Sequence, residues 1–312
     1  MATKDHYVSK FHISKFVDPS VPIGQSDWTW VVRKEQAIVK RKSPSNFAWK
    51  RGMFSKMSLN IDPPMNMEKY LSEKIEGPAS SKLIQMESLS SFSNFTVPEE
   101  ITRYLAWAAA RSLSMQELYQ KWFDSAPSDI QEMPMEGEFA WMSKCKRISR
   151  SHRMEKDGEV QFVFTENVDE FRRNGWRFVM EGDDVAETIH LQAILLRNAF
   201  AKLCWAVISA PPRNYFVLGD RPVFWKMKEK FDCEPKWLQH EDILVVAPLT
   251  KNFALIGAKS LDHIPSRLSA PHLNYMSMTA ARHWVAGPTQ QCINEMLVFS
   301  FDRLSSMLVD DT

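Results

Sequence analysis

Clusters of cationic residues are the first feature of this sequence that could do chemistry, because such clusters can bind the phosphates of a nucleic acid. Two clusters stand out, and the aromatic residues Trp49 and Phe54 lie among the cations of the first. The clusters consist of Arg33, Lys34, Lys40, Arg41, Lys42, Lys50, Arg51 and Lys56, and of Lys144, Lys146, Arg147, Arg150 and Arg153. They predict a footprint for phosphates, and the alternative is a solvated basic surface.

Carboxylates with apolar neighbours form the second group of candidates. A guanidinium ligand is recognised best by a carboxylate that pairs with it through two hydrogen bonds. The candidates for such a role are Glu76, Glu181, Asp183 and Asp220. For Glu181 and Asp183, helix capping is the alternative explanation, since both precede an apolar stripe at helical spacing.

Several kinds of enzyme are not indicated by the sequence. It contains no phosphate-binding Walker loop, no dinucleotide glycine fingerprint, no H-E-x-x-H and no G-x-S-x-G elbow. The four cysteines form no C-x-x-C pair, and His6 and His12 have no Cys or carboxylate partner at ligand spacing. We therefore expect neither a metal site nor a cofactor.

Composition favours a folded intracellular protein. Hydrophobic residues make up 44% of the 312 residues, which is enough for a packed core. The 39 Lys and Arg residues nearly balance the 38 Asp and Glu residues, so no global charge steers the chain to nucleic acid or to a membrane. The longest apolar stretch, around 199–210, is too short to span a bilayer, and the N-terminus lacks an apolar signal core. We expect a cytoplasmic location.

Helical periodicity predicts the elements that carry several of these candidates. Apolar residues at helical spacing over 67–86, interrupted by Gly77-Pro78, predict two short helices or one kinked helix around Glu76. The pair Thr96 and Glu99 has the spacing of a capping box, and the stripe that follows predicts a helix to about Phe123. A further helix should start at Asp183 or Asp184 and continue its stripe to Val207, before Pro211-Pro212.

Strands are expected mainly near the two ends of the chain. WTWVVRKEQAIVK predicts an N-terminal hairpin, and NYFVLGD, PVFW, ILVVAPLTKNFALIGA and HWVAG predict C-terminal strands, followed by a helix over 289–308. Between 126 and 176 only VQFVFT has the pattern of a strand, and this segment is interpreted as an insertion or lid. The prediction is one α+β domain over 1–312, with a helical core and a mainly antiparallel sheet built from N- and C-terminal strands.

Motifs scattered in order over most of the chain resemble a family recorded only as a domain of unknown function. Its usual opening is His-Tyr-Val-Pro, and here HYVSKFHISKF has Ser9 at the proline and Lys15 at a later asparagine. The further matches are SPSNFAWKRGMFS, EKIEG with Glu76, Arg111, NYFVLGDRPVF with Asp220, APLTKNFALIG, Asn274 and TAARHWVAG with Arg282. The family commonly has Ser-Asp-Asn-Pro where Asp220 stands.

Within that resemblance, the chain is also similar to fungal arginine-containing cyclodipeptide synthases. This similarity implies an enzyme that joins arginine and a second amino acid, both taken from aminoacyl-tRNAs, into a 2,5-diketopiperazine. The implied partners are arginyl-tRNA and a second charged tRNA, with no DNA and no membrane. An aminoacyl ester is already activated, so the absence of an ATP-binding loop is consistent with such an enzyme.

The resemblance also implies roles for the matching residues. His6 would act as the base, with Ser9 or Tyr7 beside it as a nucleophile, and Glu76 or Asp220 would hold the arginine side chain. Arg111, Asn274, Arg282 and Glu181 would bind substrate, and the two basic clusters would bind tRNA. Two other readings stay open: a nuclease that uses His6 with Glu76 or Asp220, and a noncatalytic interaction module. In the latter the same polar residues would form a buried network.

Overall fold

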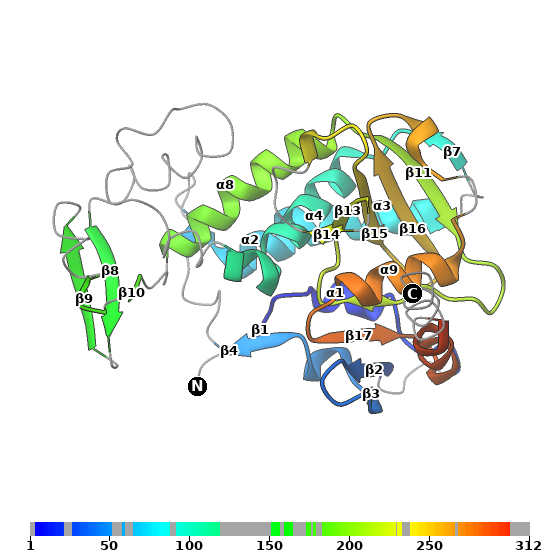
Figure 1. Ribbon diagram of the computed structural model, residues 1–312, viewed down its shortest axis with the longest axis horizontal. Coiled ribbons are helices and arrows are strands. Elements are labelled where there is room, and N and C mark those ends of the chain that lie inside the picture. Colours follow the sequence, from blue (N-terminus) through cyan, green and yellow to red (C-terminus); the bar gives the residue numbers. More distant parts are fainter. Residues whose placement is uncertain are drawn as a thin grey trace, which may run out of the picture.

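The computed structural model of the chain describes residues 4–21, 27–51, 58–59, 65–87, 92–118, 151–156, 159–164, 173–175, 177–178, 183–228, 230–232, 238–265 and 268–299. Within these ranges, every pair of neighbouring strands is antiparallel. Helices pack against these sheets (Figure 1), which confirms the α+β class.

The largest sheet contains most of the C-terminal strands. Its order is β14-β13-β15-β16-β11-β7. The strands are β7 (Phe92–Phe95), β11 (Cys204–Ser209), β13 (Phe224–Met227), β14 (Lys230–Asp232), β15 (Leu244–Pro248) and β16 (Phe253–Ala258). Strands β15 and β16 pair as a hairpin, and every residue of β16 is buried. The hairpin predicted in ILVVAPLTKNFALIGA is confirmed.

A second sheet joins the two ends of the chain. Its order is β12-β17-β2-β3, formed by β2 (Thr29–Arg33), β3 (Val39–Lys42), β12 (Leu218–Gly219) and β17 (Trp284–Gly287). Strand β17 pairs directly with β2, with Trp284 opposite Arg33. This pairing confirms the prediction of a sheet built from N- and C-terminal strands.

Three small sheets complete the strands. Strand β1 (Lys4–His6) pairs with β4 (Trp49–Arg51), and β5 (Ser58–Leu59) pairs with β6 (Met65–Asn66). Strands β8 (Ser151–Lys156), β9 (Glu159–Phe164) and β10 (Arg177–Phe178) form a sheet that lies at one end of the molecule (Figure 1). The predicted strand in VQFVFT is confirmed as β9, and its partner β8 was not predicted. Most of the proposed insertion at 126–176 lies outside the described residues.

The helices are led by an antiparallel pair. They are α1 (Lys10–Ser14), η1 (Pro44–Asn46), α2 (Met67–Tyr70), η2 (Leu71–Glu76), α3 (Gly77–Glu87), α4 (Glu99–Ala110), α8 (Asp183–Phe200), η7 (Leu261–His263) and α9 (Ala270–Ala280), with 113–118 and 290–299 also helical. Helices α4 and α8 lie side by side (Figure 1), with Arg197 2.9 Å from the Glu99 carboxylate near one end and the rings of Trp107 and His190 5.5 Å apart near the other.

The predicted helix from Thr96 to about Phe123 is wrong at its start and in its middle. Thr96 is exposed and caps nothing, and the first helical N–H groups bond to the carbonyl of Pro98. Helix α4 ends at Ala110, and the Ser112 hydroxyl accepts the N–H of Met115 at 3.3 Å to begin the next helical segment. The break places Arg111 in a turn, where its side chain can leave the helix axis.

The predicted stripe of α8 extends too far. The helix ends at Phe200, whose carbonyl accepts the indole N–H of Trp205 at 3.0 Å, and Val207 belongs to strand β11. The aromatic and β-branched run of β11 pairs with β16 along its whole length. Tertiary pairing therefore overrides the helical spacing. Helix α9 was not predicted at all.

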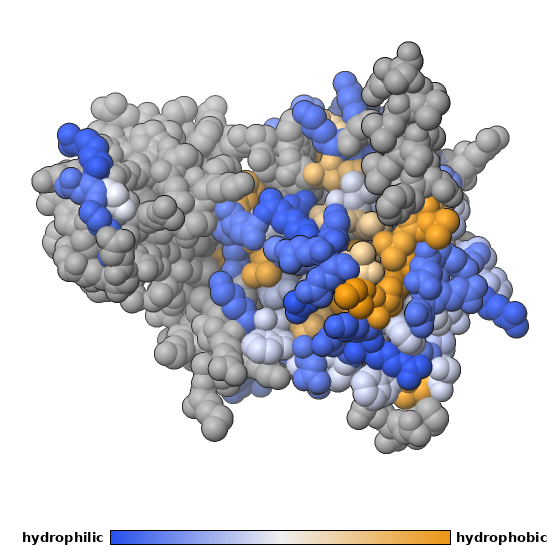
Figure 2. Space-filling model, turned by 60° about the horizontal axis from the view of Figure 1, so that its bottom comes forward, coloured by the Kyte–Doolittle hydropathy of each residue, from blue (hydrophilic) through white to orange (hydrophobic). Residues whose placement is uncertain are grey.

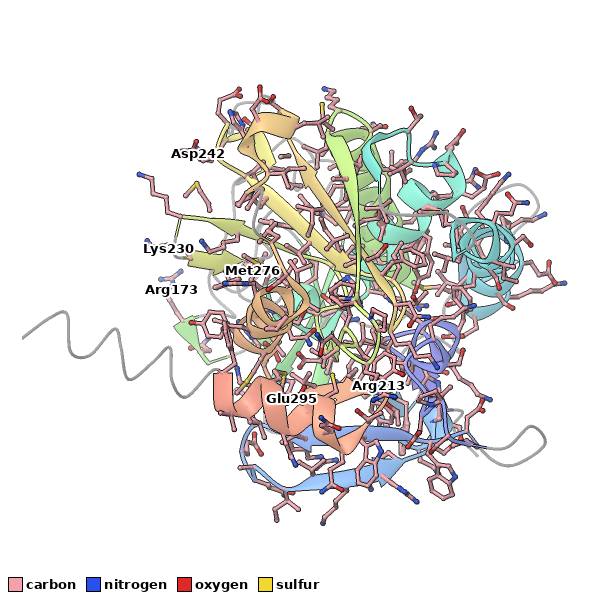
Figure 3. The ribbon with its side chains drawn as sticks, turned by 90° about the vertical axis from the view of Figure 1, so that its right-hand side faces the viewer. Arg173, Arg213, Lys230, Asp242, Met276 and Glu295 are labelled. Atoms are coloured by element: carbon pink, nitrogen blue, oxygen red, sulfur yellow. The ribbon has the colours of Figure 1, made fainter. Side chains whose placement is uncertain are left out.

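One hydrophobic core unites these elements. Its buried residues run from Tyr7 near the N-terminus to Ala286 in β17. A smaller cluster links β2, β17 and the helix over 290–299. Figure 3 shows that helix, marked by Glu295, between α9, marked by Met276, and the N-terminal strands. Both ends of the described chain thus pack into the same fold.

Close packing between β11 and β16 requires a glycine. Gly257 lies opposite Trp205, and a methyl group on its Cα would approach the indole ring to 2.9 Å. We expect Gly257→Ala to lower the free energy of unfolding by about 1–3 kcal/mol, because overpacking displaces the ring or the strand. Urea unfolding measures this loss. In a Trp205→Leu background the same change should cost less, and an equal loss in both backgrounds would contradict the explanation.

Candidate functional site

A π-helix holds Glu76, the first acidic candidate. The N–H of Gly77 donates to the carbonyl of Ser72, five residues back, which is the π pattern. Pro78 has no N–H for the carbonyl of Lys74, which accepts instead from the Arg103 guanidinium at 3.5 Å. The kink predicted at Gly77-Pro78 is therefore a widened turn within a continuous helical stretch.

The widened turn also aligns Glu76 with Glu68. In a regular α-helix, residues eight positions apart are rotated by about 80° from each other, because a turn takes 3.6 residues. A π turn holds more residues and takes up most of this difference. Both carboxylates accordingly come close to Arg111.

Arg111 forms a buried ion pair with Glu76. Its Nη2 atom lies 2.9 Å from Oε1 of Glu76, and the arginine side chain is only 4% exposed. The N-terminal segment lies against this pair, since the charge of Arg111 lowers the pKa of both His6 and His12. The turn that ends α4 and the π-helix therefore both lie against the first residues of the protein.

Polar atoms without partners gather around the ion pair. We define the Arg111 cluster as Asp5, His6, Ser9, His12, Glu68, Glu76, Tyr104 and Arg111. Within the described part of the chain, several of its buried atoms form no hydrogen bond, namely Nε2 of His6, Oγ of Ser9, Nδ1 of His12, the hydroxyl of Tyr104 and Nε of Arg111. Each such atom costs about 1–3 kcal/mol unless a ligand or water satisfies it. Their concentration at one place is typical of a binding site.

The Arg111 cluster contains more acid than base. Its carboxylates are those of Asp5, Glu68 and Glu76 and its guanidinium is that of Arg111, while Lys10 lies close enough to lower the pKa of His6 and Asp5 is 2% exposed. Burial raises the pKa of Glu68, and the charges of Asp5 and Glu76 raise it further against the opposing effect of Arg111. Like charges held together in a partly buried place favour the binding of a further cation.

Two histidines of the cluster are neutral near pH 7. Burial is the main cause that lowers the pKa of His6, and the charges of Arg111 and Lys10 lower it further. Burial also lowers the pKa of His12 to about 4, while its Nε2 lies 2.7 Å from the carbonyl of Pro248. A neutral His6 with a free ring nitrogen can accept a proton.

Ser9 lies beside these histidines. It occupies the N-cap position of α1 without forming a capping hydrogen bond, although serine usually caps at this position. Its side chain lies near the Tyr104 hydroxyl, whose pKa burial raises far above the ordinary value. The Ser9 hydroxyl can therefore hydrogen-bond to Tyr104, since it does not cap the helix.

Asp220 lies in a different environment from Glu76. Both of its carboxylate oxygens accept backbone N–H groups, from Arg282 at 2.8 Å and from His283 at 2.7 Å. Burial raises its pKa, and these two hydrogen bonds oppose the rise. Asp220 thus holds the turn before β17 and has no free oxygen directed at the Arg111 cluster. The side chain of Arg282 forms an ion pair with Glu117.

Tyr7 connects the two regions. Its hydroxyl accepts the indole N–H of Trp284 at 2.9 Å, and burial raises its pKa. His6, the preceding residue, belongs to the Arg111 cluster. Consecutive side chains of the N-terminal segment therefore serve two neighbouring sites.

The residues of the first basic cluster lie in different environments. Lys34 donates to the carbonyls of Met278 and Ala281 at the end of α9, and Arg41 lies over the Trp30 ring at 4.7 Å. Lys50 is exposed on β4, and the side chain of Arg51 is outside the described part. Arg33, Lys40 and Lys42 line a cavity of about 550 Å³ that also contains Tyr7.

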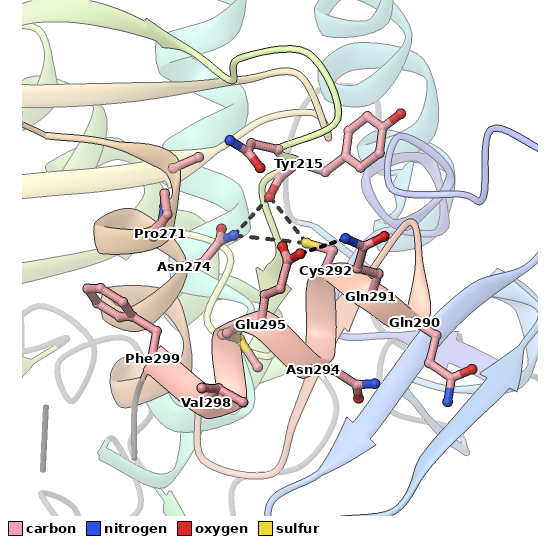
Figure 4. Close-up of a pocket in the computed structure, with 13 residues that line it drawn as sticks. Tyr215, Pro271, Asn274, Gln290, Gln291, Cys292, Asn294, Glu295, Val298 and Phe299 are labelled. Atoms are coloured by element: carbon pink, nitrogen blue, oxygen red, sulfur yellow. Dashed lines mark hydrogen bonds between the residues drawn. The ribbon is translucent and has the colours of Figure 1, made fainter. Parts of the chain in front are cut away.

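Asn274 lies in a second cavity. Its amide donates to the carbonyl of Tyr215 at 2.8 Å, and its oxygen accepts the N–H of Val217 at 2.9 Å. Figure 4 shows the contact of Asn274 with Tyr215, which lies beside Cys292 and the helix over 290–299 at a cavity of about 720 Å³. Burial raises the pKa of Cys292 to about 12, so this thiol is not an activated nucleophile. Asn274 is satisfied by backbone groups there.

Other candidates lie outside the described residues. They are Glu181 and the second basic cluster with Lys144, Lys146, Arg147 and Arg150, and the side chain of Asp183 is not described either. In the described ranges no group of His, Cys, Asp and Glu side chains is arranged to hold a metal. No described helix is long and apolar enough to cross a membrane.

Sequence reasoning missed Asp5 and Glu68. Asp5 directly precedes His6, and that adjacency was a usable signal. Glu68 stands eight residues before Glu76, a spacing that leaves two residues about 80° apart on a regular helix and that the π turn brings closer together. Tertiary structure was needed to find it.

The charge balance of the Arg111 cluster predicts a pH-dependent effect on stability. Arg111→Met should lower the free energy of unfolding by about 3–5 kcal/mol at pH 7, because it leaves buried carboxylates without their cation. Without that cation the carboxyl pKa values rise in the folded state, so the loss should shrink as pH falls toward 5. Urea unfolding at the two pH values measures it. Arg103→Met, which removes a half-exposed guanidinium, serves as the control, and an equal loss at both pH values would contradict the prediction.

His12 predicts the opposite pH dependence. The pKa of His12 is about 4 in the folded protein and about 6.5 in the unfolded chain. The folded protein therefore loses stability as pH falls below about 6.5, because the unfolded chain takes up a proton first. His12→Gln retains a donor for the Pro248 carbonyl and removes the titration. Thermal unfolding between pH 7 and 4 should fall less steeply for this variant than for the native protein. Parallel curves would show that His12 is not the cause.

Comparison with known proteins gives a family and no function. No curated protein and no solved structure matches the chain. The family model described as "Protein of unknown function (DUF4238)" matches residues 4–291, which includes the Arg111 cluster, Asp220 and Asn274. The chain therefore belongs to the DUF4238 family.

Proposed function

We propose that this protein joins arginine to a second amino acid, with both taken from aminoacyl-tRNAs, and releases a cyclic dipeptide. The proposal comes from the similarity of its motifs to arginine-containing cyclodipeptide synthases. The observation that best supports it is the Arg111 cluster, in which an excess of carboxylates lies beside a neutral imidazole. Such a site suits a cationic substrate whose amine must lose a proton.

Recognition of arginine is assigned to the acidic side of the cluster. Glu76 already pairs with a guanidinium, that of Arg111, at 2.9 Å. Glu68 and Asp5 lie near this pair and add carboxylates to the same place. A substrate guanidinium would bind between these carboxylates, and a neutral side chain would form no ion pair with them. Asp220, whose oxygens are used by backbone N–H groups, is not needed for this role.

The chemistry assigned to the cluster is two successive aminolyses. The α-amine of one aminoacyl group attacks the ester carbonyl of the other, and His6 takes the proton of the amine. An amide bond forms as the first ester bond breaks, and the proton passes to the departing tRNA hydroxyl. A second attack closes the ring and releases the second tRNA. The guanidinium of Arg111 is the donor available to a developing oxyanion.

Ser9 is the hydroxyl assigned to a covalent aminoacyl intermediate, if the first transfer uses one. Its Oγ is buried near the Tyr104 hydroxyl and His6, whereas the Tyr7 hydroxyl already accepts a hydrogen bond from Trp284 and has a raised pKa. The acyl group would move from the tRNA hydroxyl to Oγ, and the proton of Ser9 would return to that hydroxyl through His6.

Purified protein incubated with arginyl-tRNA and a pool of other charged tRNAs tests the proposal. Mass spectrometry should detect a cyclic dipeptide that contains arginine. His6→Ala should lower the rate by about 100-fold or more, since it removes the base. His263→Gln, on η7 with a ring nitrogen bonded to the Glu241 carbonyl, is the matched control. No product from any of the twenty charged tRNAs would overturn the proposal.

The presence of Glu76 near His6 also favours a second candidate, an RNA-cleaving enzyme that uses these two residues. The same incubation distinguishes it, because intact tRNA on a denaturing gel excludes cleavage. Fragments lost in His6→Ala would support the nuclease instead. Intact RNA without any product would leave a noncatalytic binding module.

A further inference from the structure

The cavity of about 550 Å³ beside Tyr7 has the size of a small-ligand site. It lies between the β2–β3 hairpin, residues 46–49 and the start of β17. The side of the molecule that carries β2 and β3 is turned forward in Figure 2, where hydrophilic residues surround smaller apolar patches. Its lining combines cations with aromatic rings, unlike the lining of the cavity beside Cys292.

The cations of this cavity come from one face of the hairpin. Lys40 lies opposite Val31 and Lys42 opposite Thr29, so both lysines share a face with Arg33 by the two-residue period of strands. Arg41 lies opposite Trp30 on the other face. Glu35 is the acid of the cavity lining, so positive charge predominates there.

The rings form the floor and one wall. Phe47 and Trp284 pack edge to face at 5.0 Å, and Trp284 is bonded to the Tyr7 hydroxyl. These three rings are buried, whereas Trp49 is half-buried and lines the cavity beside exposed Asn46. Because Trp49 lines the cavity, its indole lies within reach of a base held there.

Backbone strain marks the same place. Ala48, between Phe47 and Trp49, has φ of 58°, a conformation that costs a non-glycine residue about 1 kcal/mol or more. Its carbonyl accepts the N–H of Tyr7 at 3.1 Å, which ties the wall of the cavity to the N-terminal segment. Trp49 lies directly opposite His6 in the β1–β4 pair. The cavity therefore adjoins the Arg111 cluster.

We propose that this cavity holds the unpaired 3′-terminal nucleotide of an RNA, with its base on Trp49 and its phosphates on Arg33, Lys40 and Lys42. The inference rests on the proposed function, because an aminoacyl group is carried on that nucleotide. A nucleotide seated here would bring its acylated ribose toward His6, across the β1–β4 pair. Asn46 offers both a donor and an acceptor to the edge of the base.

Binding of uncharged RNA tests the site without any catalysis. The probe is a fluorescent single-stranded oligonucleotide ending in CCA with a free 3′-hydroxyl. Trp49→Ala should weaken its binding by about tenfold, and Trp49→Phe should largely retain it, because stacking needs a ring. Lys40→Glu/Lys42→Glu should weaken binding further and reduce its dependence on salt. Lys202→Glu, on the exposed turn after α8, removes the same kind of charge elsewhere and should leave the Kd unchanged.

The outcomes separate this site from the proposed reaction. Binding that all the cavity variants weaken, without any cyclic product from charged tRNA, would support the nucleotide site and overturn the reaction. If Trp49→Ala and Lys40→Glu/Lys42→Glu form the cyclic product at the native rate, the proposed nucleotide site is overturned and the proposed reaction stands. Tight binding of free AMP with no binding of the oligonucleotide would also overturn the proposed nucleotide site. The same holds if Lys202→Glu weakens oligonucleotide binding as much as the cavity variants do. Thermal unfolding of each variant checks that the fold is retained.

Discussion

The buried pair of Arg111 and Glu76 is the contact around which the site is arranged. A guanidinium that is only 4% exposed requires a carboxylate at hydrogen-bonding distance, since an isolated buried charge is strongly destabilising. This requirement fixes the end of α4 against the π-helix. The N-terminal segment then closes over the pair, with His6 and His12 both under the influence of its charge.

Two irregular helices make that pair possible. A regular helix through Gly77-Pro78 would turn Glu76 away from Glu68. If α4 continued without a break, Arg111 would be one more residue of that helix and its side chain would keep the helical direction. Instead the π turn widens one helix and the turn at Arg111 and Ser112 ends the other. Each irregularity removes some regular hydrogen bonds, and part of them is replaced by the Arg103 guanidinium as a donor and by the Ser112 hydroxyl as an acceptor. Such departures from regular geometry are frequent at functional sites.

Although the net charge of the chain is near zero, two regions of the structure carry local charge of opposite sign. Acid predominates around Arg111, and base predominates in the cavity lined by Arg33, Lys40 and Lys42. The N-terminal segment separates them, with His6 on the acidic side and Tyr7 on the basic side. A substrate that is cationic at one end and anionic at the other would match both places, which is the charge pattern of an arginyl group on a nucleotide.

The sequence by itself determined the α+β class, the antiparallel hairpins and the union of the two chain ends in one sheet, because period-two patterns and turn residues act locally. The resemblance of its motifs also nominated His6, Glu76 and Arg111, which the structure brings close together. Only the tertiary structure decided that Asp5 and Glu68 join them, that Asp220 holds backbone N–H groups, and that Lys34 caps α9. The physical reason is that a charged side chain looks the same in the sequence whether it meets a backbone carbonyl, an amide or an open cavity. The partner is fixed only when distant segments pack.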